Sequence, residues 1–324
     1  MSTLRLARGA QATRILGIGS TQPEQVVTNE DLSKVMDTTD QWIRERVGII
    51  ERRFAAKDES AEDMAVVAGS KALADAGLSP SDVDTVILAN CTSLTPIPNY
   101  AAPVADRIGI KRAGAFDLNA ACAGFCYGLG VASDLVRCGS SKRTLVIGSE
   151  KLTDVVDPVD RSTAIIFADA AGAAVVGPAE EPGIGPVVWG TAGDLVDMIY
   201  MRDGKYIFQE GQSVFRWATT QIAPIALRAL EAAGLQPSDV DVLIPHQANL
   251  RIVEAIAKRL RKQGARDDMV VADDIVYSGN TSSASIPMAM DHMRAAGRIH
   301  SGDVTLLIGF GAGLSYAGQV VICP

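Results

Sequence analysis

The chain has 324 residues, of which 48% are hydrophobic and 21% charged, as is usual for a globular protein of one or two domains. Its formal net charge of −8 argues against broad, sequence-independent nucleic-acid binding, which needs a positive surface. The N-terminus lacks the apolar segment of a secretory signal, and no apolar run approaches the ~20 residues that cross a bilayer. We therefore expect neither a nucleic-acid nor a membrane partner.

The five cysteines are an odd number in a large chain with no export signal. This usage favours free thiols in a reducing cytoplasm. There is no Cys-x-x-Cys pair and there are only three histidines, so the composition argues against a structural zinc site.

The first predicted helix and strand recur later in the chain. ALADAGLSPSDVDTVIL at 72–88 matches ALEAAGLQPSDVDVLIP at 229–245, 157 residues on, and TLVIG at 144–148 matches TLLIG at 305–309, 161 residues on. Each copy predicts a helix that ends at a glycine, a short turn and a buried strand. We predict two related halves, 1–178 and 179–324, of α/β type with largely parallel strands, joined in the Pro/Gly-rich stretch 177–186.

The segment RAGAFDLNAACAGFCYGLGVASDLV predicts a strand over 115–118 and then an amphipathic helix. Cys122 falls at about the first turn of that helix, where N–H groups and the helix dipole would lower the pKa of a thiol. Small neighbouring residues leave room for a substrate, and Cys126, one turn on, is expected in the core. On this segment alone, Cys122 is equally well interpreted as a buried structural thiol.

Three later segments place polar or glycine-rich turns after predicted strands. His246 follows the strand VDVLIP and precedes a helix from about Leu250; such loops collect functional groups, although a lone histidine is more often structural. Asn280 lies in YSGNTSSAS, where a turn-forming role is the alternative; the duplication should bring it together with Cys122 between the halves. The glycine-rich turn IGFGAGLSYAG at 308–318 is a weak signal for a phosphate-binding loop, and presentation of backbone N–H groups to an oxyanion is an equal alternative.

Together these segments resemble the β-ketoacyl-acyl-carrier-protein synthase III family of the thiolase superfamily, over nearly the whole chain. The resemblance rests on ACAGF, PHQAN, GNTSxAS and GFGAGLS, with DQWIRERVGI and DRSTAIIFADAAGA. Any one motif is weak, but the set in this order is specific. It implies an internally duplicated, five-layer α-β-α-β-α thiolase-like fold, which agrees with the repeat, and a cytoplasmic acyltransferase of fatty-acid biosynthesis.

The resemblance implies a ping-pong, decarboxylative Claisen condensation. Cys122 takes the acyl group of a short acyl-CoA primer, and malonyl-acyl carrier protein then loses carbon dioxide. His246 and Asn280 donate hydrogen bonds to its thioester oxygen and stabilise the attacking enolate. The backbone N–H groups of Cys122 and Ala312 form the oxyanion hole, although relatives usually carry glycine at the second position. Acyl-CoA and the malonyl carrier are substrates, and no metal or other cofactor is implied.

The resemblance also assigns binding residues. The CoA-binding residues are Trp42, Arg46, Arg161 and Asn249. The adenine is expected to stack between Trp42 and Arg161. The carrier-protein-binding residues are Arg251, Lys258 and Arg259, for which an ordinary solvated helix face is the alternative.

The implied assembly is a homodimer in which the loop 95–103 closes the partner's acyl pocket. Ile97 stands at the gating position, where relatives carry Phe or Thr, so we expect an intermediate depth and primers of about two to five carbons. The segment 194–215 is shorter than in many relatives and bears on the pocket wall.

Two alternatives remain. A condensing enzyme or acyltransferase that supplies the starter unit of a polyketide pathway would share Cys122 and His246. A non-catalytic acyl-binding or chain-length-factor-like protein would typically lack the nucleophile, and the intact Cys122, His246 and Asn280 argue against it.

Overall fold

Two five-stranded sheets form the centre of the structure, a computed structural model that describes residue 4 and residues 7–95 and 97–324. The first sheet has the order β1-β7-β6-β4-β5 and the second β12-β11-β13-β14-β8. The strands of the first are β1 (Ala12–Thr21), β4 (Thr85–Ala89), β5 (Gly114–Leu118), β6 (Thr144–Glu150) and β7 (Ala170–Ala179). Those of the second are β8 (Val188–Thr191), β11 (Val242–Pro245), β12 (Val270–Val271), β13 (Val304–Gly311) and β14 (Ser315–Ile322).

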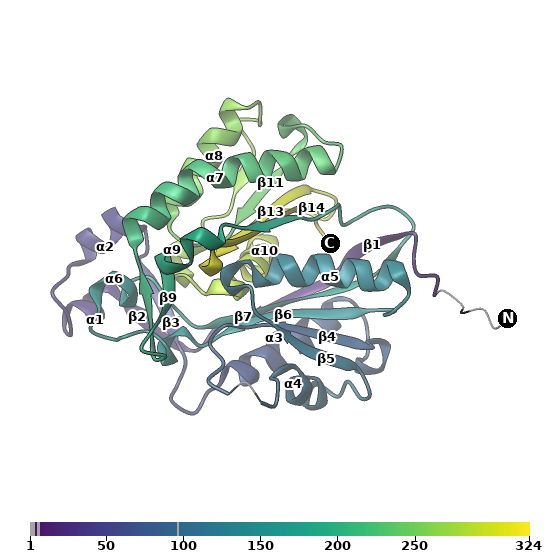
Figure 1. Ribbon diagram of the computed structural model, residues 1–324, viewed down its shortest axis with the longest axis horizontal. Helices are drawn as coiled ribbons and strands as arrows, with labels where there is room; N and C mark the ends of the chain where they lie inside the picture. Colours follow the sequence, from purple (N-terminus) through teal and green to yellow (C-terminus); the bar gives the residue numbers. More distant parts are fainter. Residues whose placement is uncertain (1–3, 5–6, 96) are drawn as a thin grey trace.

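Helices separate and cover the two sheets, as Figure 1 shows. The pair packed against the outer face of the first sheet is α3 (Ala61–Asp75) and α4 (Ala101–Ile108). The pair between the sheets is α5 (Gly124–Cys138) and α10 (Ser285–Ala295), and the pair outside the second is α7 (Gly211–Ala232) and α8 (Leu250–Lys262). These layers confirm the predicted α-β-α-β-α fold. None of the helices in the described part of the chain is both long and apolar enough to cross a membrane.

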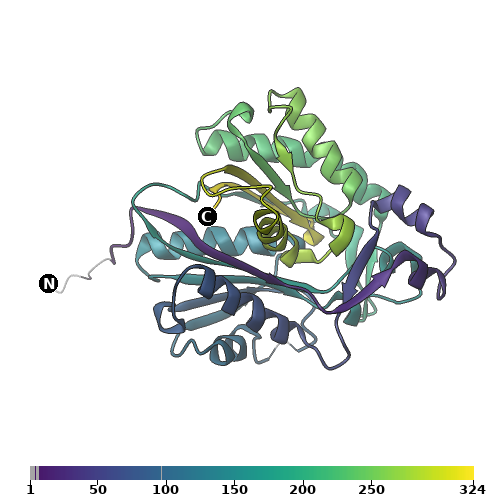
Figure 2. The ribbon, with the colours of Figure 1, turned by 180° about the vertical axis from the view of Figure 1, so that it is seen from behind.

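Smaller elements gather at one end of the molecule, on the left in Figure 1 and on the right from behind in Figure 2. They are β2 (Gln25–Thr28), α1 (Asn29–Ser33), α2 (Asp40–Val47), β3 (Glu51–Phe54), α6 (Arg161–Ala164), β9 (Ile199–Arg202), β10 (Tyr206–Gln209) and α9 (Ile275–Ser278). β9 and β10 form an antiparallel hairpin. The site described below lies among these elements.

The prediction of largely parallel strands is wrong for half of the strand pairs. β4 is parallel to β5 and β6, but β7 is antiparallel to both of its neighbours. The second sheet has the same pattern, because β11 is parallel to β12 and β13 and β14 is antiparallel to β13 and β8. β14 follows β13 through a tight turn, and only a crossover would make such strands parallel. Apolar runs buried on both faces do not report strand direction.

The duplication is visible in register and in helix ends. Thr85 of β4 lies beside Thr144 of β6, as Val242 of β11 lies beside Thr305 of β13. Gly77 and Gly234, predicted to end helices, have left-handed φ of +65° and +74°. The predicted boundary between residues 178 and 179 falls at the end of β7; the division of the chain there remains a prediction.

Equivalent glycines let each half receive a turn from the other. The turns are the 3₁₀ helices η2 (Ala121–Ala123) and η6 (Ser282–Ala284). A Cβ added at Gly148 of β6 would lie 2.4 Å from the carbonyl oxygen of Ser283, and one at Gly309 of β13 would lie 2.9 Å from the Cα of Ala123. Both contacts are shorter than real Cβ atoms make, so only glycine allows the halves to interlock here.

All five cysteines are free thiols, as the sequence predicted. Cys126 is fully buried in the cluster between the sheets, which confirms its predicted core position.

Candidate active site

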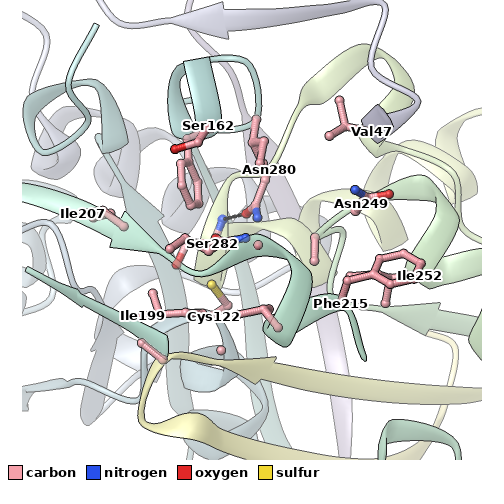
Figure 3. Close-up of a pocket in the computed structure, with 18 of the residues that line it drawn as sticks. Val47, Cys122, Ser162, Ile199, Ile207, Phe215, Asn249, Ile252, Asn280 and Ser282 are labelled. Carbon is pink, nitrogen blue, oxygen red and sulfur yellow. Dashed lines mark hydrogen bonds between the residues drawn. The ribbon is translucent and has the colours of Figure 1, made fainter. Parts of the chain in front are cut away.

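A cavity of about 670 Å³ opens at the end of the molecule where the smaller elements gather. Its lining includes Cys122 from η2, His246 from the loop after β11 and Asn280 from the turn before η6 (Figure 3). Three segments that are far apart in the sequence therefore converge, as predicted, on the junction of the two halves. The catalytic roles of the three residues are not shown by this convergence.

Cys122 sits in the 3₁₀ turn η2, two residues before α5 begins at Gly124. The residue is half-buried and lines the cavity, and burial raises the pKa of its thiol to about 12. The nearby Ser282 hydroxyl opposes this effect, and the Glu150 carboxylate adds to it. The expectation that a helix N-terminus lowers this pKa is therefore wrong, because withdrawal from water outweighs the helix. At neutral pH the resting group is a thiol.

The His246 imidazole is held from one side and is neutral. Its Nδ1 lies 2.8 Å from the Ser285 hydroxyl, which also accepts the N–H of Gln247. The ring packs edge-on against Phe310, with centroids 5.3 Å apart. Burial lowers the pKa of His246 to about 3, so the ring stays uncharged at physiological pH. Because Nδ1 is engaged with Ser285, Nε2 is the nitrogen left for a substrate.

The Asn280 side chain is oriented by its own turn. Its Oδ1 accepts the backbone N–H of Ser282 at 2.9 Å, so its Nδ2, a two-proton donor, is left for the cavity (Figure 3). Its backbone is fixed by Ile166, which accepts its N–H, and by Ala168, which donates to its carbonyl. The amide therefore belongs to a rigid frame.

The first half contains the same turn. The Oδ1 of Asn119 accepts the N–H of Ala121 at 3.2 Å. Asn119 and Ala121 each lie 161 residues before Asn280 and Ser282, the separation of the TLVIG and TLLIG motifs. Ala121 and Ser282 share left-handed φ values of +46° and +51°. Asn280 is thus the counterpart of Asn119, and Cys122 is the counterpart of Ser283.

The turn after β13 approaches Cys122 closely. A Cβ added at Gly311 would lie 2.8 Å from both the backbone nitrogen and the Cβ of Cys122. Gly311 has an extended backbone, so space and not conformation requires glycine here. Ala312, which begins η7 (Ala312–Leu314), lines the cavity beside Cys122. The oxyanion hole predicted at Cys122 and Ala312 has both residues in place, and its role remains a prediction.

The three residues predicted for the CoA adenine lie together at the cavity. The Arg161 guanidinium carbon lies 4.6 Å from the centroid of the Trp42 ring, and that of Arg46 lies 5.2 Å from it. Arg161 also donates to the carbonyl of Asp37 at 2.6 Å. When an adenine stacks between two planar groups, the groups lie roughly 7 Å apart, which is twice the optimal contact distance between stacked atoms. Arg161 must therefore move away from Trp42 if an adenine is to stack between them.

The remaining predicted binding residues divide between cavity and surface. Asn249 lines the cavity, but both polar groups of its side chain are engaged, since Oδ1 caps α8 and Nδ2 donates to the Arg46 carbonyl. Arg251 lines the cavity and lies over the Phe215 ring at 5.1 Å. Lys258 and Arg259 are exposed on α8 and are not part of the lining.

Part of the cavity wall comes from residues 199–215. Its apolar lining side chains from the β9–β10 hairpin and the start of α7 are Ile199, Met201, Ile207, Val214 and Phe215. Ile97, predicted as the gate, is 83% exposed in a surface loop and does not line this chain's own cavity. A gating role for Ile97 therefore requires a second chain.

Several groups at or beside the cavity were missed by the sequence analysis. They are Cys91, Glu150, Arg216, Ser282, Ser285 and Phe310. Glu150 lies 161 residues before Gly311, so the offset of the repeat would have pointed to it. The other residues carry no signal in the sequence beyond their proximity to a motif. Among the described residues, no group of three or more His, Cys, Asp or Glu side chains is arranged to hold a metal ion.

Comparison with known proteins identifies the family. The model of 3-oxoacyl-[acyl-carrier-protein] synthase III matches residues 116–193, and that of its C-terminal part matches residues 230–323. A β-ketoacyl-[acyl-carrier-protein] synthase III of Streptomyces coelicolor is 50% identical, with 97% of this chain and 99% of that protein covered.

Solved structures agree. The priming β-ketosynthase of a polyketide biosynthetic pathway superposes with a TM-score of 0.95 at 40% identity, covering 100% of this chain and 99% of that one. The 3-oxoacyl-[acyl-carrier-protein] synthase III of Aquifex aeolicus gives 0.91 at 38% identity, covering 96% and 100%. The chain belongs to the β-ketoacyl-acyl-carrier-protein synthase III family of condensing acyltransferases and has its thiolase-like fold.

Proposed function

We propose that the protein joins a short acyl-CoA primer to malonyl-acyl carrier protein by decarboxylative Claisen condensation, and so initiates fatty-acid synthesis. The observation that carries the proposal is the meeting of a thiol, a neutral imidazole and an oriented amide at one cavity. The family relationship supports the same chemistry.

In the first half-reaction Cys122 attacks the thioester carbon of the acyl-CoA. With a pKa of about 12 the thiol must lose its proton as it attacks, and the neutral His246 can accept that proton and pass it to the departing CoA sulfur. The N–H groups of Cys122 and Ala312 would stabilise the oxyanion. The step neither consumes nor releases a proton.

In the second half-reaction carbon dioxide leaves the malonyl thioester, and its bonding electrons form an enolate. The Nε2–H of His246 and the Nδ2–H of Asn280 donate to the enolate oxygen. The enolate carbon attacks the acyl-Cys carbonyl, and the departing Cys122 sulfur takes up one proton. His246 suits this role because its pKa of about 3 keeps the imidazole neutral, with one N–H to donate. The Ser285 hydroxyl can donate to Nδ1 or accept from it, so it supports the tautomer that each half-reaction needs.

A second candidate function is priming of a polyketide pathway. The TM-score of 0.95 to a priming β-ketosynthase favours it. The chemistry at Cys122, His246 and Asn280 is the same in both cases. The two functions are distinguished by kcat/KM towards fatty-acid and polyketide acyl carrier proteins with one primer.

Removing Cys122 and Asn280 should separate the half-reactions. Incubation with acetyl-CoA should add one acetyl mass to the wild-type protein and none to Cys122→Ala, measured by intact-protein mass spectrometry. Asn280→Ala should still be acylated, but its decarboxylation of malonyl carrier protein should fall on the order of 10²–10³-fold, as for loss of one oxyanion donor. Acetylation that maps to Cys126, or equal loss of both half-reactions in Asn280→Ala, would contradict these roles.

Gly311→Ala should abolish acylation of Cys122. The new Cβ would lie 2.8 Å from the Cys122 nitrogen and Cβ, which forces the nucleophile away from its position. The matched control is Gly193→Ala, where an added Cβ meets nothing within 4 Å. The measurement is the acetylation rate, with circular dichroism to check folding. A Gly311→Ala protein that acylates at the wild-type rate would show that this approach is not needed.

We propose that acyl carrier protein docks on the exposed face of α8 beside the cavity. Arg251 lines the cavity, Lys258 lies two turns, about 10 Å, along the same helix face, and Arg216 adds a further cation to the lining. Arg259 donates to the Thr220 carbonyl, which ties it to α7.

Lys258→Glu should raise KM for malonyl carrier protein several-fold and leave KM for acetyl-CoA unchanged, since Lys258 lies outside the cavity lining. The effect should shrink as salt screens exposed charges beyond about 10 Å at 0.1 M. Lys142→Glu, an exposed lysine that precedes β6 by two residues, is the control. Equal KM changes in both variants would refute docking on α8.

We further propose a homodimer in which Ile97 enters the partner's acyl pocket. β5 is an edge strand, and Phe116 on it is 37% exposed. The neighbouring loop, tied to β5 by Asn99 and Tyr100, exposes Leu94 and Ile97 by 67% and 83%. Exposed apolar side chains beside an unpaired edge are typical of an interface.

Ile97→Phe should shift primer preference towards acetyl, and Ile97→Thr should shift it towards longer acyl groups. A methylene is worth only ~1–3 kcal/mol in an apolar pocket, so the change should be graded. The measurement is kcat/KM over a series of chain lengths, with sedimentation to confirm that each protein is dimeric. Identical profiles in all three proteins would remove Ile97 as the gate.

A further inference from the structure

The duplication places a second, closed copy of the active-site geometry beside the cavity. The offset of 161 residues relates Cys122 to Ser283, and Glu150 at the end of β6 to Gly311 at the end of β13. Gly311 has no side chain and leaves room beside Cys122. Glu150 fills the equivalent space beside Ser283.

Glu150 is fully buried, and neutral groups from two segments, 91–92 and 282–283, hold its carboxylate. Oε2 accepts the N–H of Cys91 and the hydroxyl of Thr92, both at 3.0 Å. Oε1 accepts the hydroxyls of Ser282 and Ser283 at 3.0 and 2.8 Å, and the thiol of Cys91 donates to it at 3.4 Å. One side chain therefore joins the end of β4 to the turn of the other half that follows Asn280.

No cation balances this carboxylate among the described residues. The adjacent lysine, Lys151, donates to the carbonyls of Ala56 and Lys57 and lies 3.7 Å from Asp154. Burial raises the pKa of Glu150, and the hydrogen bonds from the N–H of Cys91 and the three hydroxyls act against that rise. A buried carboxylate without a cation costs several kcal/mol unless its hydrogen bonds are complete. Removing its acceptor capacity should therefore disturb every segment that it joins.

Ser282 is the residue that connects Glu150 to the proposed chemistry. Its hydroxyl is fixed by Glu150, and its N–H is the donor that fixes Oδ1 of Asn280. Its left-handed φ of +51° is a conformation that a serine does not favour by itself. The orientation of the Asn280 amide therefore depends on Ser282, and the position of Ser282 depends on Glu150.

We propose that Glu150 is a positioning residue for the malonyl half-reaction, which it supports by holding Ser282 so that the Nδ2 of Asn280 faces the thioester oxygen. This inference rests on the function proposed above. It assigns Glu150 no contact with substrate.

Glu150→Gln tests the proposal because it keeps the size of the side chain. The N–H of Cys91 can only donate, so the amide oxygen must face it and the amide NH₂ must face Ser282 and Ser283. The Ser282 hydroxyl then has to accept instead of donate, and its proton turns away from position 150. The turn that orients Asn280 loses its anchor, while Cys122 keeps its place in η2.

The expected result is a loss in one measurement and no loss in the other. Decarboxylation of malonyl carrier protein should fall about tenfold in Glu150→Gln. Alkylation of Cys122 by iodoacetamide at pH 7.5 should stay the same or become faster, because the Glu150 anion opposes the thiolate. Cys91 also lines the cavity and its thiol donates to Oε1 of Glu150 at 3.4 Å, so the Glu150 anion raises the pKa of Cys91 as well, and the label is mapped to its residue by peptide mass spectrometry.

Two variants complete the design. Glu150→Asp keeps a carboxylate that only accepts, so it should decarboxylate faster than Glu150→Gln although it is smaller. Ser282→Ala removes the hydroxyl through which Glu150 holds Ser282, so it should also lower decarboxylation more than acylation. It also remains informative if Glu150→Gln fails to fold.

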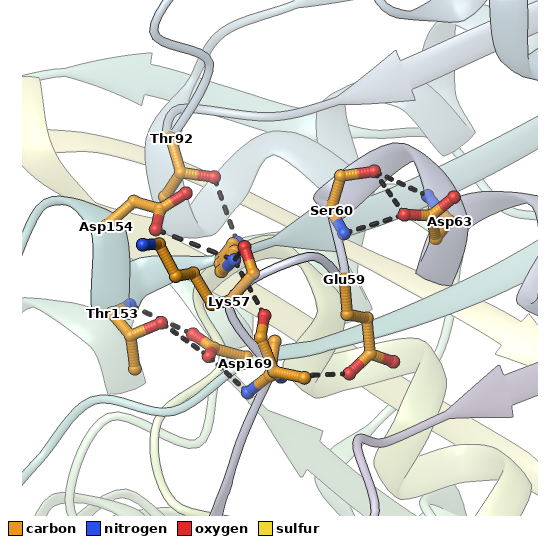
Figure 4. Close-up of polar contacts among 11 residues, drawn as sticks. Lys57, Glu59, Ser60, Asp63, Thr92, Thr153, Asp154 and Asp169 are labelled. Carbon is orange, nitrogen blue, oxygen red and sulfur yellow. Dashed lines mark hydrogen bonds and ion pairs between the residues drawn. The ribbon is translucent and has the colours of Figure 1, made fainter.

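The matched control is Asp169→Asn (Figure 4). Asp169 is equally buried and accepts the N–H of Ala55 together with the N–H and hydroxyl of Thr153, but it does not line the cavity. It should lower the melting temperature as Glu150→Gln does, without changing the ratio of decarboxylation to acylation.

The outcomes separate this inference from the proposed function. Proportional loss of decarboxylation, acylation and stability in Glu150→Gln, or an equal change of ratio in Asp169→Asn, would overturn the positioning role alone. If wild-type protein does not decarboxylate malonyl carrier protein, or if Asn280→Ala does so at the wild-type rate, the proposed function fails and this inference fails with it. A loss of decarboxylation without loss of acylation in Glu150→Gln, larger than in Glu150→Asp, supports both the positioning role and the proposed function.

Discussion

The active site depends on how closely the two halves approach each other. The turn η2 of the first half sits against Gly309 of β13, and the turn η6 of the second half sits against Gly148 of β6. A side chain at either glycine would meet backbone atoms of the opposite turn, which cannot move without moving the helix that follows it. The positions of Cys122 and Asn280 are therefore set by two sheets at once, which is the rigidity that preorganised donors require.

Burial then determines the electrostatic character of the site. It raises the pKa of the Cys122 thiol and lowers that of the His246 imidazole, so the resting pair is neutral. An ion pair of thiolate and imidazolium would be a stronger nucleophile, but its cation could not later serve as a neutral donor. A neutral pair can exchange a proton only as the reaction requires it. In a site of low dielectric constant, neutral donors aimed at an enolate oxygen are also stronger than in water.

The sequence predicted the fold and the convergence of the three polar residues, because the repeat and the motifs are local patterns. The sequence-based predictions were wrong where a property depends on atoms that are distant in the sequence. The thiol of Cys122 was expected to be acidic from its place near a helix, but its pKa depends on burial by the other half and on Glu150. The direct stack of Arg161 on Trp42 and the antiparallel strands β7 and β14 arise from tertiary packing. Glu150 ends the strand TLVIGSE and carries no motif, so only the pairing of the halves makes it visible.

The same pairing explains why only one of the two equivalent turns opens to the cavity. Ser283 occupies the place of Cys122, with an equivalent turn before it and an equivalent helix after it. Its hydroxyl is surrounded by acceptors, the Glu150 carboxylate at 2.8 Å and the Ala89 carbonyl at 2.9 Å, and the residue is only 1% exposed. At Cys122, Gly311 leaves this space empty and a substrate can enter. A glycine in one half and a glutamate at the equivalent position of the other therefore leave one of two similar turns open to the cavity and close the other.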